Sequence, residues 1–126
     1  MRLVETLATE VRNRHAALYS LTMFIDLPEF RRDRPQPIAG FVPDLFAVDT
    51  PETCRIIGEA KTPLDFETER SRAQIAAFLT HLSRFPTSHF YLAVPLLYRL
   101  RAESLVGGIR SDVSASGVGV HVIGGG

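Results

Sequence analysis

Apolar residues at the start of the chain recur every three to four positions. Over residues 2–21 they form one stripe, which consists of Leu3, Val4, Leu7, Val11 and Leu18. This spacing predicts a first, amphipathic helix. Residues 27–37 then break the pattern with several prolines and a cluster of arginines, so we expect an exposed loop there.

Two apolar, partly β-branched runs follow at residues 38–48 and 54–60, and a turn-like sequence separates them. They predict a β-hairpin. Thr62, Pro63 and Asp65 are typical of a helix start, and we expect that helix to reach about residue 85. Its expected buried positions are Ile75, Phe78, Leu79 and Leu82. A strand at residues 90–94, a helix at 96–105 and a last strand at 118–123 complete the prediction.

This order of elements predicts an α/β fold, with a mixed central sheet flanked by helices. At 126 residues we expect a single domain over residues 1–126. Fourteen acids offset fourteen bases, so any contact with nucleic acid must come from local patches. The single cysteine excludes an intrachain disulfide. Without a membrane-length apolar run or an apolar leader, we expect a cytoplasmic protein with no membrane partner.

The hairpin places two carboxylates opposite each other. With a loop of two or four residues, Asp44 faces Glu59, whereas a three-residue loop would place Asp44 diagonally. Lys61, the only lysine among fourteen basic residues, points to the same side as Glu59. Opposed acids in an apolar sheet repel each other, and a hard divalent cation would compensate for this. The alternative is a solvated hairpin end with an ordinary Glu59–Lys61 ion pair.

These residues resemble a known family. Pro43-Asp44 followed by Glu59-Ala60-Lys61 is similar to the PD-(D/E)XK signature of restriction-endonuclease-like nucleases, a group that includes Holliday junction resolvases and virus-type replication and repair nucleases. That resemblance implies an αβββαβ core, and it fits this chain if residues 38–41 form a first short strand. It further implies a Mg²⁺-dependent deoxyribonuclease that cleaves with structure selectivity or weak selectivity.

The resemblance also implies roles for individual residues. Asp44, Glu59 and the Ala60 carbonyl would hold Mg²⁺ or Mn²⁺, while Lys61 would orient or deprotonate the attacking water. Members of the family often add an acid on the first helix and a glutamine on the helix after the motif. Glu10 and Gln74 are the candidates for these catalytic positions, although Glu5 and plain surface roles stay open.

Several arginines could contact DNA phosphates: Arg12, Arg14, Arg31, Arg32, Arg34, Arg70 and Arg72. Cutting both strands would need a homodimer or a larger protein partner. We interpret His15, His81, His89 and His121 as structural or surface residues, because their spacing is not that of metal ligands. Two alternatives remain: a non-catalytic nucleic-acid-binding or assembly subunit with a nuclease-like fold, and an α/β interaction domain with a coincidental motif.

Overall fold

The computed structural model describes residues 3–17, 21–27, 34–50 and 52–125. In chain order its elements are α1 (Leu3–Arg14), β1 (Thr22–Ile25), β2 (Leu45–Val48), β3 (Cys54–Ala60), α2 (Glu69–Leu82), β4 (Thr87–Pro95), the 3-10 helix η2 (Leu96–Tyr98), α3 (Arg99–Asp112) and β5 (Gly119–Gly125). The fold is therefore α/β, as predicted. Among the described residues, no helix is both long and apolar enough to cross a bilayer.

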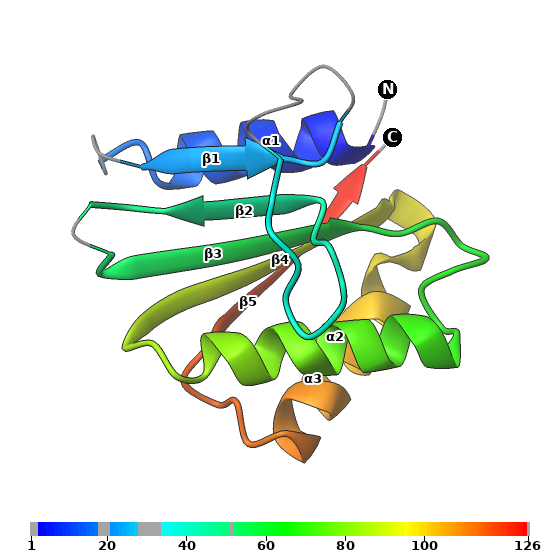
Figure 1. Cartoon of the computed structure of the whole chain (residues 1–126). Helices are drawn as coiled ribbons and strands as arrows, with labels where there is room; N and C mark the ends of the chain where they lie inside the picture. The colour runs from blue at the N-terminus through cyan, green and yellow to red at the C-terminus, as the bar shows by residue number, and fades with distance from the viewer. Residues whose placement is uncertain (1–2, 18–20, 28–33, 51, 126) are drawn as a thin grey trace.

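The five strands form one mixed sheet in the order β1-β2-β3-β4-β5, which Figure 1 shows. The β1–β2 and β2–β3 pairs are antiparallel, whereas β3, β4 and β5 run parallel to one another. The two parallel pairs need helical crossovers, and α2 and α3 supply them. The central strand β3 thus has an antiparallel neighbour on one side and a parallel neighbour on the other.

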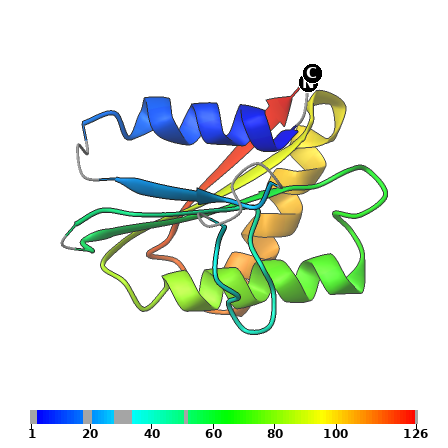
Figure 2. The same ribbon diagram turned by 45° about the horizontal axis from the view of Figure 1, so that its top comes forward.

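Helices cover both faces of the sheet, α1 on one side and α2 with α3 on the other (Figure 2). Side chains alternate between these layers along β3. Ile56 belongs to the apolar cluster beneath α1, whereas Ile57 belongs to the cluster beneath α2 and α3. Because both faces are covered, β3 is almost entirely buried.

The helix α1 packs closely on β3 at a glycine. Leu7 is fully buried, and its Cδ2 atom would lie 2.8 Å from a Cβ atom added at Gly58. A larger residue at position 58 would push Leu7 and its helix away from the sheet. The small residue in the Gly58-Glu59-Ala60 sequence therefore has a packing role beside the candidate site.

The predicted first helix and first strand were wrong in extent and place. The helix ends at Arg14 instead of continuing to residue 21, and Leu18 lies outside the described residues. Residues 22–25 form β1, which pairs with β2. Ile38 and Phe41 form only an isolated bridge around a turn, so β2 begins at Leu45. The strand β1 is only four residues long and forms by pairing with β2, so its local pattern is a weak signal.

Other predicted boundaries shift less. The helix α2 begins at Glu69, with Thr68 as its N-cap, because the Thr62 hydroxyl donates a hydrogen bond to Asp65 within a preceding turn. The strands β4 and β5 extend beyond residues 90–94 and 118–123. The α3 helix begins at Arg99, after the 3-10 turn at residues 96–98.

The hairpin prediction is confirmed in its second strand and its register. The strand β3 has the predicted bounds. Leu45 pairs with Gly58, and the register continues to Val48 opposite Arg55. This is the register that sets residue 44 against residue 59.

Replacing Leu7 by alanine should loosen α1 from the sheet. The side chain is fully buried, so we expect Leu7→Ala to lower the free energy of unfolding by about 2–5 kcal/mol. Leu97→Ala is the matched control, because Leu97 is 92% exposed and should change stability by less than about 0.5 kcal/mol. Urea unfolding followed by circular dichroism measures both, and equal effects would contradict this view of α1.

Candidate active site

The acids at positions 44 and 59 meet where β2 begins and β3 ends. The Asp44 backbone N–H donates a hydrogen bond of 2.9 Å to Oε1 of Glu59. The Ala60 backbone N–H donates one of 2.8 Å to Oδ2 of Asp44. The two carboxyl groups are therefore opposed across the strand pair, as the hairpin register predicted.

A lysine ammonium lies beside the acids. Nζ of Lys61 is 3.5 Å from Oε2 of Glu59, and the Lys61 side chain is only 12% exposed. It also donates a hydrogen bond to Oε1 of Gln74 on α2. The Lys61 backbone N–H donates to the Ala93 carbonyl on β4, at 2.9 Å. Glu59 and Gln74 thus hold the ammonium, while β4 holds the Lys61 backbone.

These groups line a polar pocket of about 320 Å³ on the α2 side of the sheet. Its lining residues are Asp44, Glu59, Ala60, Lys61, Asp65, Thr68, Arg70, Ser71 and Gln74. Gln74 is nearly buried, so its amide serves the pocket and not the solvent. The structure brings together Asp44, Glu59, Ala60, Lys61 and Gln74, five of the residues that the sequence nominated.

Burial changes the protonation of the two acids. Desolvation, followed by repulsion from Asp44, raises the pKa of Glu59 to about 8, against the opposing effect of Lys61. Desolvation also raises the pKa of Asp44, although the Ala60 N–H and the Lys61 ammonium oppose the change. Near neutral pH the pair therefore holds a proton that a bound cation would displace.

The donor set fits a hard divalent cation. Two carboxylates and a backbone carbonyl, that of Ala60, are oxygen ligands of the kind that Mg²⁺ and Mn²⁺ prefer. The buried Glu59 and the half-buried Asp44, with one ammonium beside them, also leave negative charge uncompensated when both ionise. A cation at this point would satisfy the pair, which is the fit that the sequence predicted.

Glu10 lies elsewhere. Its carboxylate forms an ion pair of 3.0 Å with Arg14 on α1, and it does not line the pocket. Its charge acts on Tyr91 and not on Asp44 or Glu59. Glu5 is exposed on the same helix and does not line the pocket either.

The predicted DNA-binding arginines lie at different distances from the pocket. Arg70 lines the pocket, and Arg34 pairs with Asp26, whose charge acts on Asp44. Arg72 lies in a groove between α2 and α3. The others stand apart from the pocket or outside the described residues: Arg12 and Arg14 are exposed on α1, and Arg31 and Arg32 are not described.

One acid near the site escaped the sequence analysis. The Asp26 backbone N–H donates to the Asp44 carbonyl at 2.8 Å, and the Asp26 charge raises the pKa of Asp44. Asp26 directly follows β1, which the sequence analysis did not find. An apolar run at residues 22–25 that ends in an acid was the available signal. Asp26 is therefore close to Asp44, where Glu10 had been expected to supply an additional acid.

Ionisation of Glu59 should make stability depend on pH in metal-free buffer. The folded protein keeps the Glu59 proton up to about pH 8, whereas the unfolded chain loses it near 4.5. The Glu59 contribution to the free energy of unfolding should therefore fall as pH rises between these values, by at most about 1.4 kcal/mol per pH unit. The raised pKa of Asp44 acts in the same direction. The histidines with lowered pKa values add stability as pH rises to about 6.5, so the net fall is expected above that pH. Urea unfolding in EDTA at a series of pH values measures the slope.

Two variants separate this effect from other groups. Glu59→Gln should flatten the decline above about pH 7, whereas Glu52→Gln, at an exposed position, should keep it. The histidines contribute below this range, because His15, His81, His89 and His121 have pKa values lowered from 6.5. An unchanged slope in Glu59→Gln would show that Glu59 ionises normally.

Comparisons of the chain with protein-family models, with curated proteins and with solved structures find no match.

Proposed function

We propose that this chain is a metal-dependent nuclease that hydrolyses phosphodiester bonds of DNA. The observation that carries the proposal is the arrangement of Asp44, Glu59 and Lys61 in one polar pocket, with Gln74 holding the lysine. An ordinary surface ion pair does not explain it, because the Glu59 side chain is only 3% exposed and faces a second acid. Acids whose pKa values are raised by desolvation and by each other cluster at functional sites.

The order of elements supports a restriction-endonuclease-like core. Helix α1, strands β1 to β3, helix α2 and strand β4 follow one another as αβββαβ. The strand β1 takes the place for which residues 38–41 were expected. Asp44 then stands at the start of the second strand, Glu59 and Lys61 at the end of the third, and α2 follows. This is the placement that the resemblance to PD-(D/E)XK nucleases implies.

Asp44, Glu59 and the Ala60 carbonyl would hold Mg²⁺ or Mn²⁺. The ion would supply Lewis-acid polarisation of a scissile phosphate and a more acidic bound water. The chain contributes a fixed ligand pair, because backbone N–H groups orient both carboxylates. Fixed ligands lower the cost of reorganising the site during the reaction.

Lys61 would act on the water and on the phosphate charge. Its ammonium is held by Gln74 and Glu59 and lies in the same pocket as both acids. From this position it would orient the attacking water and stabilise negative charge that develops on the phosphate oxygens. Arginine would not replace it, since a planar guanidinium differs in size and geometry and stays protonated.

Contact with the DNA backbone would come from cations at the pocket rim. Arg70 is exposed and lies over the Phe41 ring, 5.3 Å from its centroid. Its guanidinium is available to a phosphate next to the scissile one. Because the chain has no net charge, we expect weak binding that depends on the shape of the DNA more than on its sequence.

Removing the lysine should abolish cleavage without unfolding the protein. We expect Lys61→Ala and Lys61→Arg to cut DNA at least about 100-fold more slowly, because a positioned proton-transfer group contributes about 10²–10⁴-fold. Purified protein would be incubated with linear, nicked, single-stranded and branched DNA and with RNA, in Mg²⁺, Mn²⁺ or EDTA. Glu103→Gln on α3 is the matched control, because its charge is exposed and paired with Arg99 on the same helix.

The outcomes separate the proposal from its rivals. Cleavage that requires the metal and disappears in both Lys61 variants supports the nuclease. Salt-sensitive DNA binding without cleavage by the folded, metal-loaded protein would favour a non-catalytic nucleic-acid-binding subunit. Failure to bind either metal or DNA would favour an interaction domain with a coincidental motif.

Arg70 should contribute to DNA binding as a single phosphate contact. We expect Arg70→Ala to weaken binding of all substrates to a similar extent and to reduce the slope of log K against log salt by about one unit. Arg12→Ala is the matched control, since Arg12 is exposed on α1 and does not line the pocket. Fluorescence anisotropy over a salt series, with Ca²⁺ in place of Mg²⁺ to prevent cleavage, measures both slopes. An equal effect of Arg12→Ala would place the DNA elsewhere.

A further inference from the structure

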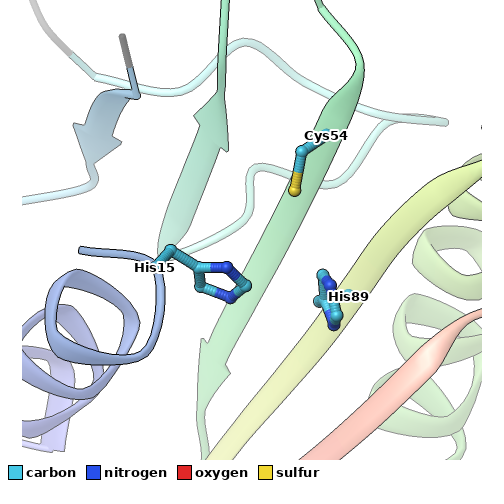
Figure 3. A group of neighbouring side chains, drawn as sticks. All are labelled: His15, Cys54 and His89. Carbon is cyan, nitrogen blue, oxygen red and sulfur yellow. The ribbon is translucent and has the colours of Figure 1, made fainter. Parts of the chain in front are cut away.

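A second cluster of metal-ligating side chains lies beneath the end of α1. His15 directly follows α1, Cys54 begins β3, and His89 is on β4; their side chains point toward one another in Figure 3. One ligand atom from each lies within 4.8 Å of the others. The spacing of the histidines along the chain gave no sign of this cluster, because residues far apart in sequence meet here.

We propose that His15, Cys54 and His89 form a binding site for Zn²⁺. One thiolate and two imidazoles are the borderline-soft donors that zinc prefers, and three protein ligands leave one position for water. Zinc–ligand bonds of about 2.0–2.3 Å separate tetrahedral ligand atoms by about 3.5 Å. Small side-chain rotations would close the present spacing to this value.

Neighbouring side chains are placed to orient both imidazoles. Nε2 of His15 is 2.8 Å from the Tyr91 hydroxyl, and Nδ1 of His89 is 3.0 Å from Nε2 of His121. Each ring then keeps its other nitrogen for the metal. Zinc-bound histidines commonly donate their second N–H to such a partner, which sets the tautomer.

The electrostatic surroundings can accommodate a cation. Oδ1 of Asp49 accepts the backbone N–H of Cys54, so a carboxylate lies close to the thiol. Arg14 lies 3.5 Å from Nδ1 of His121, but its guanidinium already pairs with Glu10 at 3.0 Å. If Nε2 of His121 accepts a hydrogen bond from Nδ1–H of His89, the His121 proton lies on Nδ1, opposite the Arg14 guanidinium. Arg14 then turns away from His121 toward Glu10, with which it already pairs. The apparent catalytic candidate Glu10 thus neutralises a cation beside the zinc site.

Burial also favours the neutral imidazoles that zinc requires. Desolvation, then repulsion from His89, lowers the pKa of His15, and desolvation lowers the pKa of His89. Burial, then the Asp49 charge, raises the pKa of the Cys54 thiol, so zinc must displace a proton there. The backbone permits the close approach, because a Cβ atom at Gly119 would lie 2.7 Å from Nδ1 of His89. Glycine at 119 therefore leaves room for the His89 ring.

The zinc site is separate from the candidate active site. Cys54 is at the beginning of β3 and belongs to the apolar cluster beneath α1, whereas Glu59 lies near the end of the strand, in the pocket beside α2. The donors differ as well, oxygen in one and nitrogen with sulfur in the other. Because the ligands come from three elements, zinc would fasten the end of α1 to β3 and β4.

Metal titration tests the proposal on tag-free protein in excess Mg²⁺. We expect one equivalent of Zn²⁺ to bind with submicromolar affinity and to raise the unfolding temperature. Co²⁺ should give a thiolate charge-transfer band. His15→Gln, His89→Gln and Cys54→Ser should each weaken Zn²⁺ binding by more than about 100-fold, and His121→Gln by about 10–100-fold. Circular dichroism of the metal-free variants confirms that they fold.

Two controls make the result specific. His81→Gln changes a histidine that contacts Arg55 instead of the cluster, and Asp44→Asn changes the candidate active site; both should bind Zn²⁺ as the parent does. The proposal is overturned if the parent binds no stoichiometric zinc, if the cobalt complex lacks the thiolate band, or if His81→Gln weakens binding as much as His89→Gln. Loss of binding in Asp44→Asn would assign the zinc to the other site.

Discussion

The pairing register of β2 with β3 is the constraint on which the rest of the structure depends. It sets Leu45 opposite Gly58, and the acids follow at the next pair. Because side chains alternate between faces, a slip of one residue would turn Glu59 toward α1 and away from Gln74. The same slip would replace Gly58 by a residue with a side chain at the position that packs against Leu7. Core packing and the polar pocket therefore require the same register.

The polar pocket exists at the expense of favourable packing. Two carboxyl groups that repel each other lie beside an almost buried ammonium, at the end of a strand that is otherwise apolar. Burying such groups costs free energy unless partners satisfy them. The surrounding structure supplies part of this compensation through Gln74 and two backbone N–H groups. Local conflict of this kind, inside an otherwise consistent fold, is typical of functional sites.

The sequence predicted the parts of the fold that depend on local pattern. The strand β3 and its register followed from alternation and a short turn, and the position of Gln74 followed from helical spacing on α2. The strand β1 was missed because its stability comes from pairing with β2, some twenty residues away. The grouping of His15, Cys54 and His89 was missed for the same reason, since three elements bring these residues together. Contacts between distant segments leave no periodic signal in the chain.

The hydrogen bonds at the end of the hairpin give both acids a structural role. Asp44 and Glu59 each accept a backbone N–H of the opposite strand, so their side chains act as the last rungs of the β2–β3 ladder. A chain of this fold without catalytic activity would therefore still have a structural reason to retain both acids. Among the described residues, the Lys61 ammonium contacts only side chains, those of Gln74 and Glu59. The lysine is therefore the more informative residue when activity is judged from sequence, because the sheet does not need its charge.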